Sequence, residues 1–467
     1  MLVVPRYFVL LKRITETFMM NMNVHKLPNT VSLFVPEMKK DLHDEIFNKM
    51  KDDTNMKNLS NDSTAFCRYI KARHPPPTLD EIKFKEKEYI NKILEKNDPS
   101  DLNTEKNVSR FKITLKKKLE FALKQSVYAW KPIEFTSYVG KQYLLNRMPA
   151  EYAVLNRIFL EISNRCPEFT PSSLLDFGSG VGTVTSVIRK YWGNSIIEYF
   201  NVDSSPEMHK IAKMMLTGGD PEGTLPIKHV FYRQFLPSRT NIKYDIVVCS
   251  YSLFEFSNTE IRLQTLLKLW NNTNDFFIIV EQGTTQGFKL IEEARNFIVQ
   301  TDALSEYSSG VHIFSPCPHE TDCPQVKFTE KPCCFRAHYF SLPISKRSTI
   351  LTEYYSYVIF KKGKRPSNDP AWPRVIRPVY KRKKRATCHL CTKDCKLRTL
   401  VFTKNKHGLT NYHVARSVKV GDRLPMTFSE CFLEDLDYDA DTEVHDVSEE
   451  DFSDYDDETE HEFNEKN

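Results

Sequence analysis

The sequence predicts an α/β fold in which a parallel, doubly wound sheet carries helices on both faces. Short apolar runs alternate with helical patterns over residues 174–300, and this alternation is typical of parallel sheets with helical crossovers. A glycine-rich loop at 176–182 joins the first predicted strand to the first predicted helix. At about 150 residues per domain, a chain of 467 residues has room for two or three units with cores of their own.

Each element of the sheet is predicted from its apolar periodicity. The strands are expected at 174–177, 196–202, 227–231, 244–249 and 276–280. The helices between them are expected at 183–192, 205–216, 258–270 and 286–300. Another helix, at 151–166, precedes the sheet, and an apolar run at 354–360 predicts a late strand of the same sheet.

Further segments flank this domain, which we place at 151–360. Residues 31–150 have a helical, charge-rich pattern, and the lysines of a helix at 110–125 are expected to face solvent. A cysteine-containing insertion, a basic linker and a small β-rich unit are expected at 301–352, 361–385 and 386–428. In the β-rich unit we expect a hairpin, with strands at 397–403 and 410–418 joined by an Asn-Lys-His-Gly turn.

The two ends of the chain have opposite charge patterns. Residues 1–15 contain three basic residues and no acid, and their apolar residues fit one helix face, so residues 1–30 are predicted to be a mitochondrial presequence. Residues 430–467 contain 18 acidic residues and one lysine. We therefore predict that residues 429–467 form a disordered, solubilising tail, with screening of the basic body as the alternative.

The remainder of the chain is strongly basic. Outside residues 430–467 it has 65 Lys and Arg residues against 43 Asp and Glu residues, a formal charge of +22. This charge favours a polyanionic partner, for which RNA or DNA is the first candidate. No apolar run reaches the roughly 18–20 residues of a membrane-spanning helix, so no membrane insertion is expected.

The glycine loop predicts a site for a nucleotide-like ligand. Its glycines allow a tight turn and close approach of a ligand to the helix N-terminus. A carboxylate after the next strand can accept hydrogen bonds from both ribose hydroxyls of a nucleoside. Because the loop begins with an acid, it resembles motif I of class I S-adenosylmethionine-dependent methyltransferases more than a NAD fingerprint. The resemblance implies that S-adenosylmethionine binds at Asp176, Gly178, Gly180, Gly182 and Asp203.

The sequence presents no catalytic residue for methyl transfer. Enzymes that methylate base amino groups usually carry an Asn- or Asp-Pro-Pro-aromatic motif after the fourth strand, where this chain has Cys249-Ser250-Tyr251-Ser252. Methylation of cytosine C5 needs a nucleophilic cysteine, and a buried cysteine at a strand end is more often a packing residue. We expect methyl transfer to be absent or weak, and an active rRNA methyltransferase is the alternative.

Seven of the eleven cysteines fall in two short stretches, 317–334 and 388–395. Thiolates gathered from separated loops can form a tetrahedral zinc site or hold an iron–sulfur cluster, and ligand type alone does not separate the two. A zinc-stapled nucleic-acid-binding protein is therefore a further alternative.

Four motifs in a fixed order resemble one protein family. After the glycine-loop sheet come Cys-Pro-His-x3-Cys-Pro at 317–324, Cys-x-Phe at 333–335, a basic Arg-Pro stretch and His-Leu-Cys at 389–391. Over residues 143–425 this order resembles the mitochondrial methyltransferase-like protein 17 family and its fungal and bacterial relatives of the small ribosomal subunit. The resemblance implies a 4Fe-4S cluster on Cys317, Cys323, Cys333 and Cys391. Cys388 competes with Cys391, and Cys334 competes with Cys333.

The same resemblance implies a factor that assembles the mitochondrial small ribosomal subunit in the matrix by binding rRNA and ribosomal proteins. We expect it to act as a monomer on the particle. Residues 361–385 combine eleven Lys or Arg residues with Trp372 and Tyr380, and RNA binding uses both kinds of side chain. A solvated linker is the alternative. The predicted RNA contacts are Arg377, Lys381, Arg382, Lys383, Lys384 and Arg385.

Overall fold

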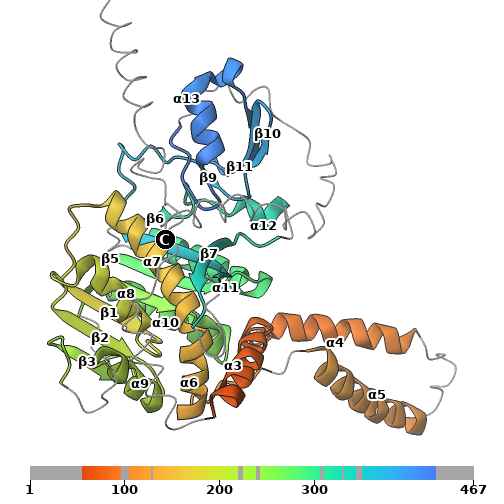
Figure 1. Ribbon diagram of the computed structural model, residues 1–467. Coiled ribbons are helices and arrows are strands. Elements are labelled where there is room, and N and C mark those ends of the chain that lie inside the picture. Colours follow the sequence, from red (N-terminus) through yellow and green to blue (C-terminus); the bar gives the residue numbers. More distant parts are fainter. Residues whose placement is uncertain are drawn as a thin grey trace, which may run out of the picture. The chain divides into compact units, whose positions relative to one another are not determined.

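The computed structural model describes residues 55–95, 105–127, 130–218, 224–237, 242–305, 310–328, 331–342 and 350–426 (Figure 1). These residues belong to one compact unit. The predicted presequence at 1–30 and the predicted acidic tail at 429–467 lie outside the described residues.

The predicted doubly wound sheet is present, and its strand order is β3-β2-β1-β4-β5-β8-β6 with β7 paired to β8. Strands β1 to β5 pair in parallel, whereas β8 runs antiparallel between β5 and β6. This order with one reversed strand is the topology of class I methyltransferases, which confirms that part of the predicted fold. The strands are β1 (Ser173–Phe177), β2 (Glu198–Val202), β3 (Val230–Arg233), β4 (Tyr244–Ser250), β5 (Thr273–Gln282), β6 (Val311–Ser315), β7 (Phe335–Phe340) and β8 (Ile350–Lys362).

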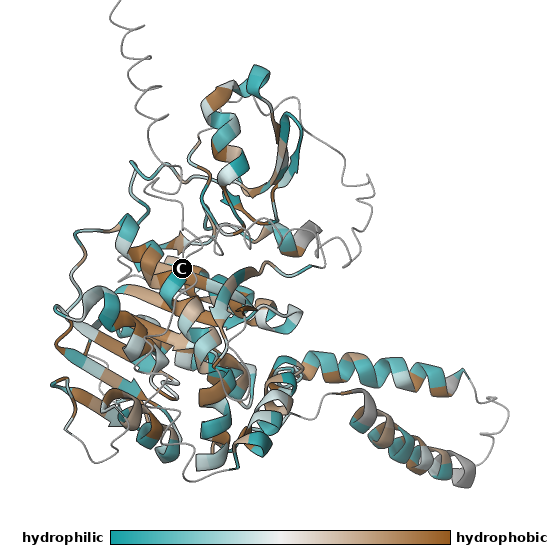
Figure 2. Ribbon diagram, viewed as in Figure 1, coloured by the Kyte–Doolittle hydropathy of each residue, from teal (hydrophilic) through white to brown (hydrophobic). Residues whose placement is uncertain are grey.

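Two apolar cores lie on the two faces of this sheet, whose strands are the most hydrophobic part of the molecule (Figure 2). Side chains alternate along a strand, so Ile246 and Val248 of β4 enter one core while Val247 and Cys249 enter the other. The first core includes residues of α6 (Ser137–Asn146), α7 (Met148–Arg165), α8 (Thr183–Trp192) and α9 (Pro206–Leu216). The second includes residues of α10 (Thr259–Asn271) and α11 (Thr285–Leu304). The helices predicted between the strands are thus confirmed.

The segment before the sheet is helical, as predicted. It forms α3 (Met56–Lys71), α4 (Leu79–Leu94) and α5 (Glu105–Ser126). Thr78 and Glu81 form a capping box that satisfies backbone N–H groups at the start of α4. Helix α3 packs against α6, whereas α4 packs against α5. On α5 the exposed lysines are Lys112, Lys116, Lys117, Lys118 and Lys124.

The C-terminal part forms a second, smaller sheet in the order β10-β11-β12, with β9 also paired to β11. Its strands are β9 (Arg374–Val375), β10 (Tyr380–Arg382), β11 (Arg385–Cys391) and β12 (Leu397–Phe402), and α13 (Lys404–Ser417) follows. The predicted strand at 410–418 and its turn are therefore wrong. Thr403 caps α13 by accepting a hydrogen bond from Lys406 N, and Gly408 interrupts the helix with φ of +79°. The hairpin partner of β12 is β11.

The basic segment 361–385, predicted as a linker, is folded over part of its length. It contains the end of β8 and all of β9 and β10, and Arg374 is buried. The Arg374 guanidinium donates hydrogen bonds to Glu161 of α7 at 2.9 Å, to Ser315 Oγ at 2.9 Å and to Pro316 O at 2.9 Å. Glu161 also accepts from Arg165 at 2.9 Å. One buried carboxylate thus joins α7, the end of β6 and the start of the smaller sheet.

Removing this carboxylate should destabilise the fold. Burial alone would raise the pKa of Glu161, but the charges of Arg374 and Arg165 and the hydrogen bond from Arg374 lower it to about 2. Glu161→Gln leaves two buried guanidinium groups without their counter-charge, so we expect the free energy of unfolding at pH 7 to fall by about 3–5 kcal/mol. Urea denaturation measures this loss, and Glu120→Gln on the exposed side of α5 is the control.

The pH dependence of the same variant has a defined sign. A lowered carboxyl pKa contributes stability that is present above the unfolded-state value of about 4.5 and is lost as the pH falls toward about 2. The difference between wild type and Glu161→Gln should therefore be constant from pH 7 to pH 5 and should shrink below that. If the difference in unfolding free energy between wild type and Glu161→Gln stays constant down to pH 3.5, the lowered pKa assigned to Glu161 is contradicted.

Candidate ligand pocket and cysteine site

The glycine loop after β1 has a conformation that requires glycine. The φ angles of Gly178, Gly180 and Gly182 are +72°, +50° and +79°. A Cβ atom on Gly178 would lie 1.9 Å from Ser252 Oγ, so no side chain fits there. The loop is anchored because the backbone N–H groups of Gly178 and Ser179 donate to Val202 O of β2, at 2.8 and 3.0 Å.

The two predicted acids of the loop region occupy different environments. Asp203 is held at the loop, where its carboxylate accepts from Gly180 N at 2.9 Å and from Ser205 N at 2.8 Å. Asp176 is fully buried, and neither of its carboxylate oxygens has a hydrogen-bond partner. Burial, followed by the charge of Asp203, raises the pKa of Asp176 well above its usual value. Both effects favour the protonated form of the Asp176 carboxyl.

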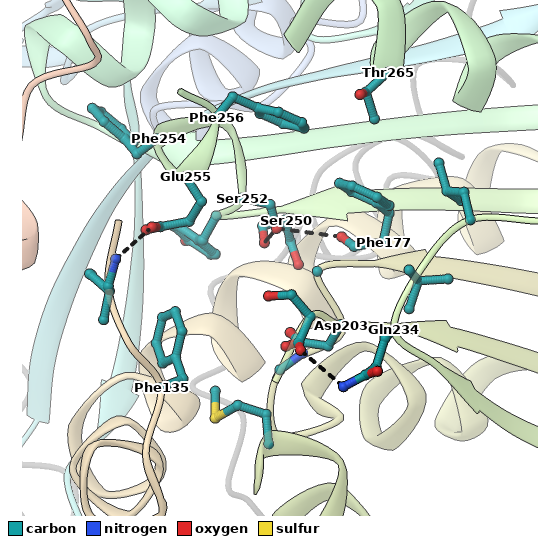
Figure 3. A pocket seen from close by; sticks show the side chains of 18 of the residues that line it. Phe135, Phe177, Asp203, Gln234, Ser250, Ser252, Phe254, Glu255, Phe256 and Thr265 are labelled. Atoms are coloured by element: carbon teal, nitrogen blue, oxygen red, sulfur yellow. Dashed lines mark hydrogen bonds between the residues drawn. The ribbon is translucent and has the colours of Figure 1, made fainter. Parts of the chain in front are cut away.

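A cavity of about 600 Å³ opens above the loop, within the usual size range of small-molecule sites (Figure 3). Gly178, Gly180 and Asp203 line it, whereas Asp176 and Gly182 do not; Gly182 is the N-cap of α8. The remaining lining is largely aromatic and apolar, and it comes from strand ends and from the segment before the sheet. It includes Phe135, Tyr143, Phe177, Val202, Phe235, Leu236, Tyr251, Phe254 and Phe256.

The N-terminal segment contributes to the wall of this cavity. Arg73, which follows α3, forms an ion pair with Glu255 of the short helix η3 (Leu253–Glu255) and donates to Lys131 O at 3.0 Å. Trp130 Nε1 donates to Phe254 O at 2.7 Å. Sequence reasoning missed these residues, because Arg73 and Trp130 lie more than 100 positions before their partners in η3 and carry no motif.

A buried polar network occupies the position after β4, where base-methylating enzymes carry their motif. Tyr251 has φ of +54°, and the Arg147 guanidinium lies 4.9 Å from the centre of its ring. Arg147 donates to Glu353 of β8 at 2.8 Å, and Lys71 of α3 donates to the same carboxylate at 2.9 Å. Burial, followed by the charges of Glu281 and Asp176, raises the pKa of the Cys249 thiol well above its usual value. A thiolate nucleophile is therefore disfavoured at Cys249.

The four cysteines predicted to act together line one small pocket. Cys317 follows β6, Cys323 precedes α12 (Pro324–Phe328), Cys333 precedes β7, and Cys391 ends β11. Burial raises the pKa of the Cys333 thiol, and the neighbouring Cys323, Cys317 and Cys391 raise it further. Segments of the two sheets therefore meet at this point.

The competing cysteines lie elsewhere. Side chains three residues apart on a strand point to opposite faces, so Cys388 faces α13, with its Sγ 3.6 Å from Ala415 O. Cys334 and Cys395 do not line the pocket. His319 Nε2 lies 3.4 Å from Cys391 Sγ. Within the described ranges, no three His, Cys, Asp or Glu side chains converge as the ligands of a metal ion do.

The predicted RNA contacts are at the surface of the smaller sheet. Lys381 and Arg382 lie on β10, Lys383 and Lys384 in its turn, and Arg385 at the start of β11, and all five are exposed. Arg377 is half-buried. Of the two aromatic residues, Tyr380 is exposed, whereas Trp372 is half-buried beneath Arg423, whose guanidinium lies 5.2 Å from its ring.

A family model described as mitochondrial small ribosomal subunit Rsm22 matches residues 137–425, which is more than half of the chain. The chain belongs to the Rsm22 family. This Rsm22-family chain is 34% identical over 375 residues to the human protein described as ribosome assembly protein METTL17, mitochondrial, and the match covers 80% of each chain. It is 28% identical over 329 residues to Rsm22-cox11 tandem protein 2, mitochondrial, of Schizosaccharomyces pombe, covering 61% of this chain and 43% of that protein.

These curated relatives are mitochondrial, and the Rsm22-family chain is a mitochondrial protein as well. Among solved structures, it resembles a magnesium protoporphyrin IX methyltransferase of Synechocystis PCC 6803 with bound SAM. The identity is 12%, the TM-score is 0.27, and the match covers 52% of this chain and 91% of that one. None of the helices in the described residues has the length and apolar character needed to span a membrane.

The buried Glu281 carboxyl at the end of β5 should make the stability of the fold depend on pH. It accepts from Leu253 N at 2.7 Å, its second oxygen has no partner, and burial raises its pKa to about 8. Folded protein keeps a proton that the unfolded chain loses above about pH 4.5, so this group destabilises the fold increasingly as the pH rises toward about 8.

Replacing the Glu281 carboxyl by an amide should remove this pH dependence of stability. We expect the free energy of unfolding of Glu281→Gln to gain more than about 1 kcal/mol relative to wild type between pH 5 and pH 8. Urea midpoints at the two pH values measure the change, with Glu260→Gln on the exposed side of α10 as the control. Parallel pH profiles for wild type and Glu281→Gln would show that the carboxyl titrates normally.

Proposed function

We propose that this Rsm22-family protein assembles the mitochondrial small ribosomal subunit in the matrix by binding rRNA and ribosomal proteins, as a monomer on the particle. The observation that carries the proposal is the smaller sheet, in which β10 and β11 present five exposed basic side chains at 381–385. Such a cluster neutralises phosphates. The description of the human relative as a ribosome assembly protein supports the same reading.

S-adenosylmethionine is the ligand that we propose for the cavity above the glycine loop. The cavity has the size of a small-molecule site, and the loop leaves its backbone open to a ligand. Asp203 would accept hydrogen bonds from the ribose hydroxyls, while Phe177 and Phe235 offer apolar surface to the adenine. Asp176 and Gly182 would contribute to binding indirectly, Asp176 from the end of β1 and Gly182 from the N-cap of α8.

A 4Fe-4S cluster is the group that we propose for Cys317, Cys323, Cys333 and Cys391. The donor set fits, because four thiols line one pocket and cysteine thiolates hold such clusters. A four-iron cluster separates its cysteine sulfurs more widely than a single ion does. Loading would stabilise the junction of the two sheets, since a metal group that binds only the folded arrangement adds its binding free energy to folding.

Methyl transfer is proposed to be absent or weak. The position after β4 carries a tyrosine packed against Arg147, and the Cys249 thiol is held protonated. Glu255 of η3 lines the cavity, but its carboxylate is paired with Arg73. An active rRNA methyltransferase remains the alternative function. It is favoured by the preserved cavity, which an assembly scaffold alone does not require.

Gly178→Ala should prevent S-adenosylmethionine binding, because its Cβ atom meets Ser252 Oγ at 1.9 Å and disturbs the loop. Gly363→Ala is the matched control, since Gly363 also has positive φ, +91°, but a Cβ atom there meets nothing within 4 Å. Calorimetry should show at least about a tenfold loss of affinity, or 1.4 kcal/mol, for Gly178→Ala beyond that of the control. Equal affinities would place the ligand elsewhere.

Cys391→Ser should remove the cluster, whereas Cys388→Ser, three residues earlier on the same strand, should retain it. The first thiol faces the pocket and the second faces α13. The measurements are iron and acid-labile sulfide content and visible absorbance after anaerobic purification. Iron loss in Cys388→Ser with retention in Cys391→Ser would reverse the assignment, and zinc in place of iron in wild type would favour the zinc-stapled alternative.

The function itself is tested by complementation of cells that lack the protein, with mitochondrial small-subunit rRNA as the readout. We expect wild type and Gly363→Ala to restore the rRNA and Cys391→Ser to fail. Rescue by Gly178→Ala would mean that the protein acts as a scaffold. Failure of this variant together with a missing methyl group on the rRNA would support the methyltransferase alternative.

A further inference from the structure

The smaller sheet has one covered face and one open face. Side chains alternate along its strands, so Ala386, Cys388 and Leu390 of β11 are buried on the side of α13 together with Leu400 and Phe402 of β12. The opposite side chains form the surface that we call the outer face. It consists of Tyr380, Arg382, Arg385, Thr387, His389, Thr399 and Val401.

The strand register brings two rings onto the outer face. Tyr380 lies opposite Thr387, which lies opposite Val401, so these three side chains form one row. His389 lies opposite Thr399 in the next row, and its Nδ1 is 2.9 Å from Thr399 Oγ1. The Tyr380 side chain is 49% exposed and the His389 side chain is half-buried. Two flat surfaces thus lie on adjacent rows.

Basic residues surround these rings, and one of them holds the Tyr380 ring. Arg382 donates from Nε to the Tyr380 hydroxyl at 2.9 Å, and its guanidinium lies 4.8 Å from the centre of the ring. No Asp or Glu occurs in β10, β11, β12 or α13. The exposed lysines at 381, 383 and 384 edge the face.

We propose that the outer face is a stacking platform for unpaired bases of single-stranded RNA. The inference rests on the proposed function of RNA binding and deepens it, because it names the kind of RNA and the side chains that contact it. Exposed aromatic rings stack on bases, and the surrounding cations neutralise the phosphates of the same strand. Duplex RNA hides its base faces, so it can use only the cations. Charge complementarity therefore selects a polyanion, and the rings select its unpaired form.

The test compares two RNA probes on the full-length protein. Fluorescence anisotropy measures Kd for a single-stranded 12-mer of mixed sequence and for a 16-base-pair duplex. Base–aromatic stacking contributes about 1–3 kcal/mol per base, so Tyr380→Ala should weaken binding of the single strand by roughly 5- to 150-fold. Its affinity for the duplex should stay within about twofold of wild type.

Matched variants separate stacking from other effects. Tyr69→Ala on α3 removes a tyrosine of similar exposure, 48%, and should change neither affinity. Tyr380→Phe keeps the ring and should retain most of the single-strand affinity, and His389→Ala should weaken that affinity alone. Neutralising Lys381, Lys383 and Lys384 to Gln should weaken both probes and reduce the salt slope of binding by up to about three units.

The outcomes distinguish this inference from the proposed function. If wild type binds neither probe, RNA binding itself fails. If wild type binds RNA but Tyr380→Ala weakens both probes equally or neither, the platform is overturned and the proposed function stands. If Tyr380→Ala strengthens RNA binding, the tyrosine ring opposes RNA instead of stacking on it, which also overturns the platform. Circular dichroism of each variant verifies folding.

Discussion

The buried contact between Glu161 and Arg374 is the constraint on which the arrangement of the sites depends. Glu161 belongs to α7 of the methyltransferase-like sheet, and Arg374 belongs to β9 of the smaller sheet. The same guanidinium holds Ser315 and Pro316, immediately before Cys317. A buried charge pair specifies geometry because neither charge tolerates separation from the other. It therefore fixes where Cys317 lies relative to β11, which carries Cys391.

The cavity above the glycine loop depends on a second set of buried charges. Glu353 of β8 accepts from Arg147 and from Lys71, and Arg73 pairs with Glu255. These contacts join the segment before the sheet to β8 and to η3. The wall of the cavity thus combines that segment with the glycine loop and with strand ends that lie far away in the sequence.

Sequence reasoning succeeds where one short-range pattern carries the information. The alternation of strands and helices predicts the parallel, doubly wound sheet, and the glycines predict the tight turn after β1, because both patterns are local in the chain. The strand expected at 410–418 fails because a short segment of mixed apolar and polar residues fits either a strand or a helix, and the Thr403 cap decides for the helix. The wall contributed by Arg73 could not be predicted, since its partner Glu255 is 182 positions away. Cys388 and Cys391 lie on one strand, three residues apart, so alternation alone predicts that they face opposite sides and that only one of them can line the pocket.

The alternation along β11 has a thermodynamic consequence. Cys391 and His389 lie on the same face of one strand, two residues and about 7 Å apart. Where the cysteine pocket holds its cluster and the outer face holds RNA, both ligands order the same strand. Ordering of the strand by one ligand lowers the entropic cost for the other, and because linkage is reciprocal the two effects are equal in size. Bound RNA would then slow the removal of iron by chelators, and an iron-poor protein would leave the ribosomal particle.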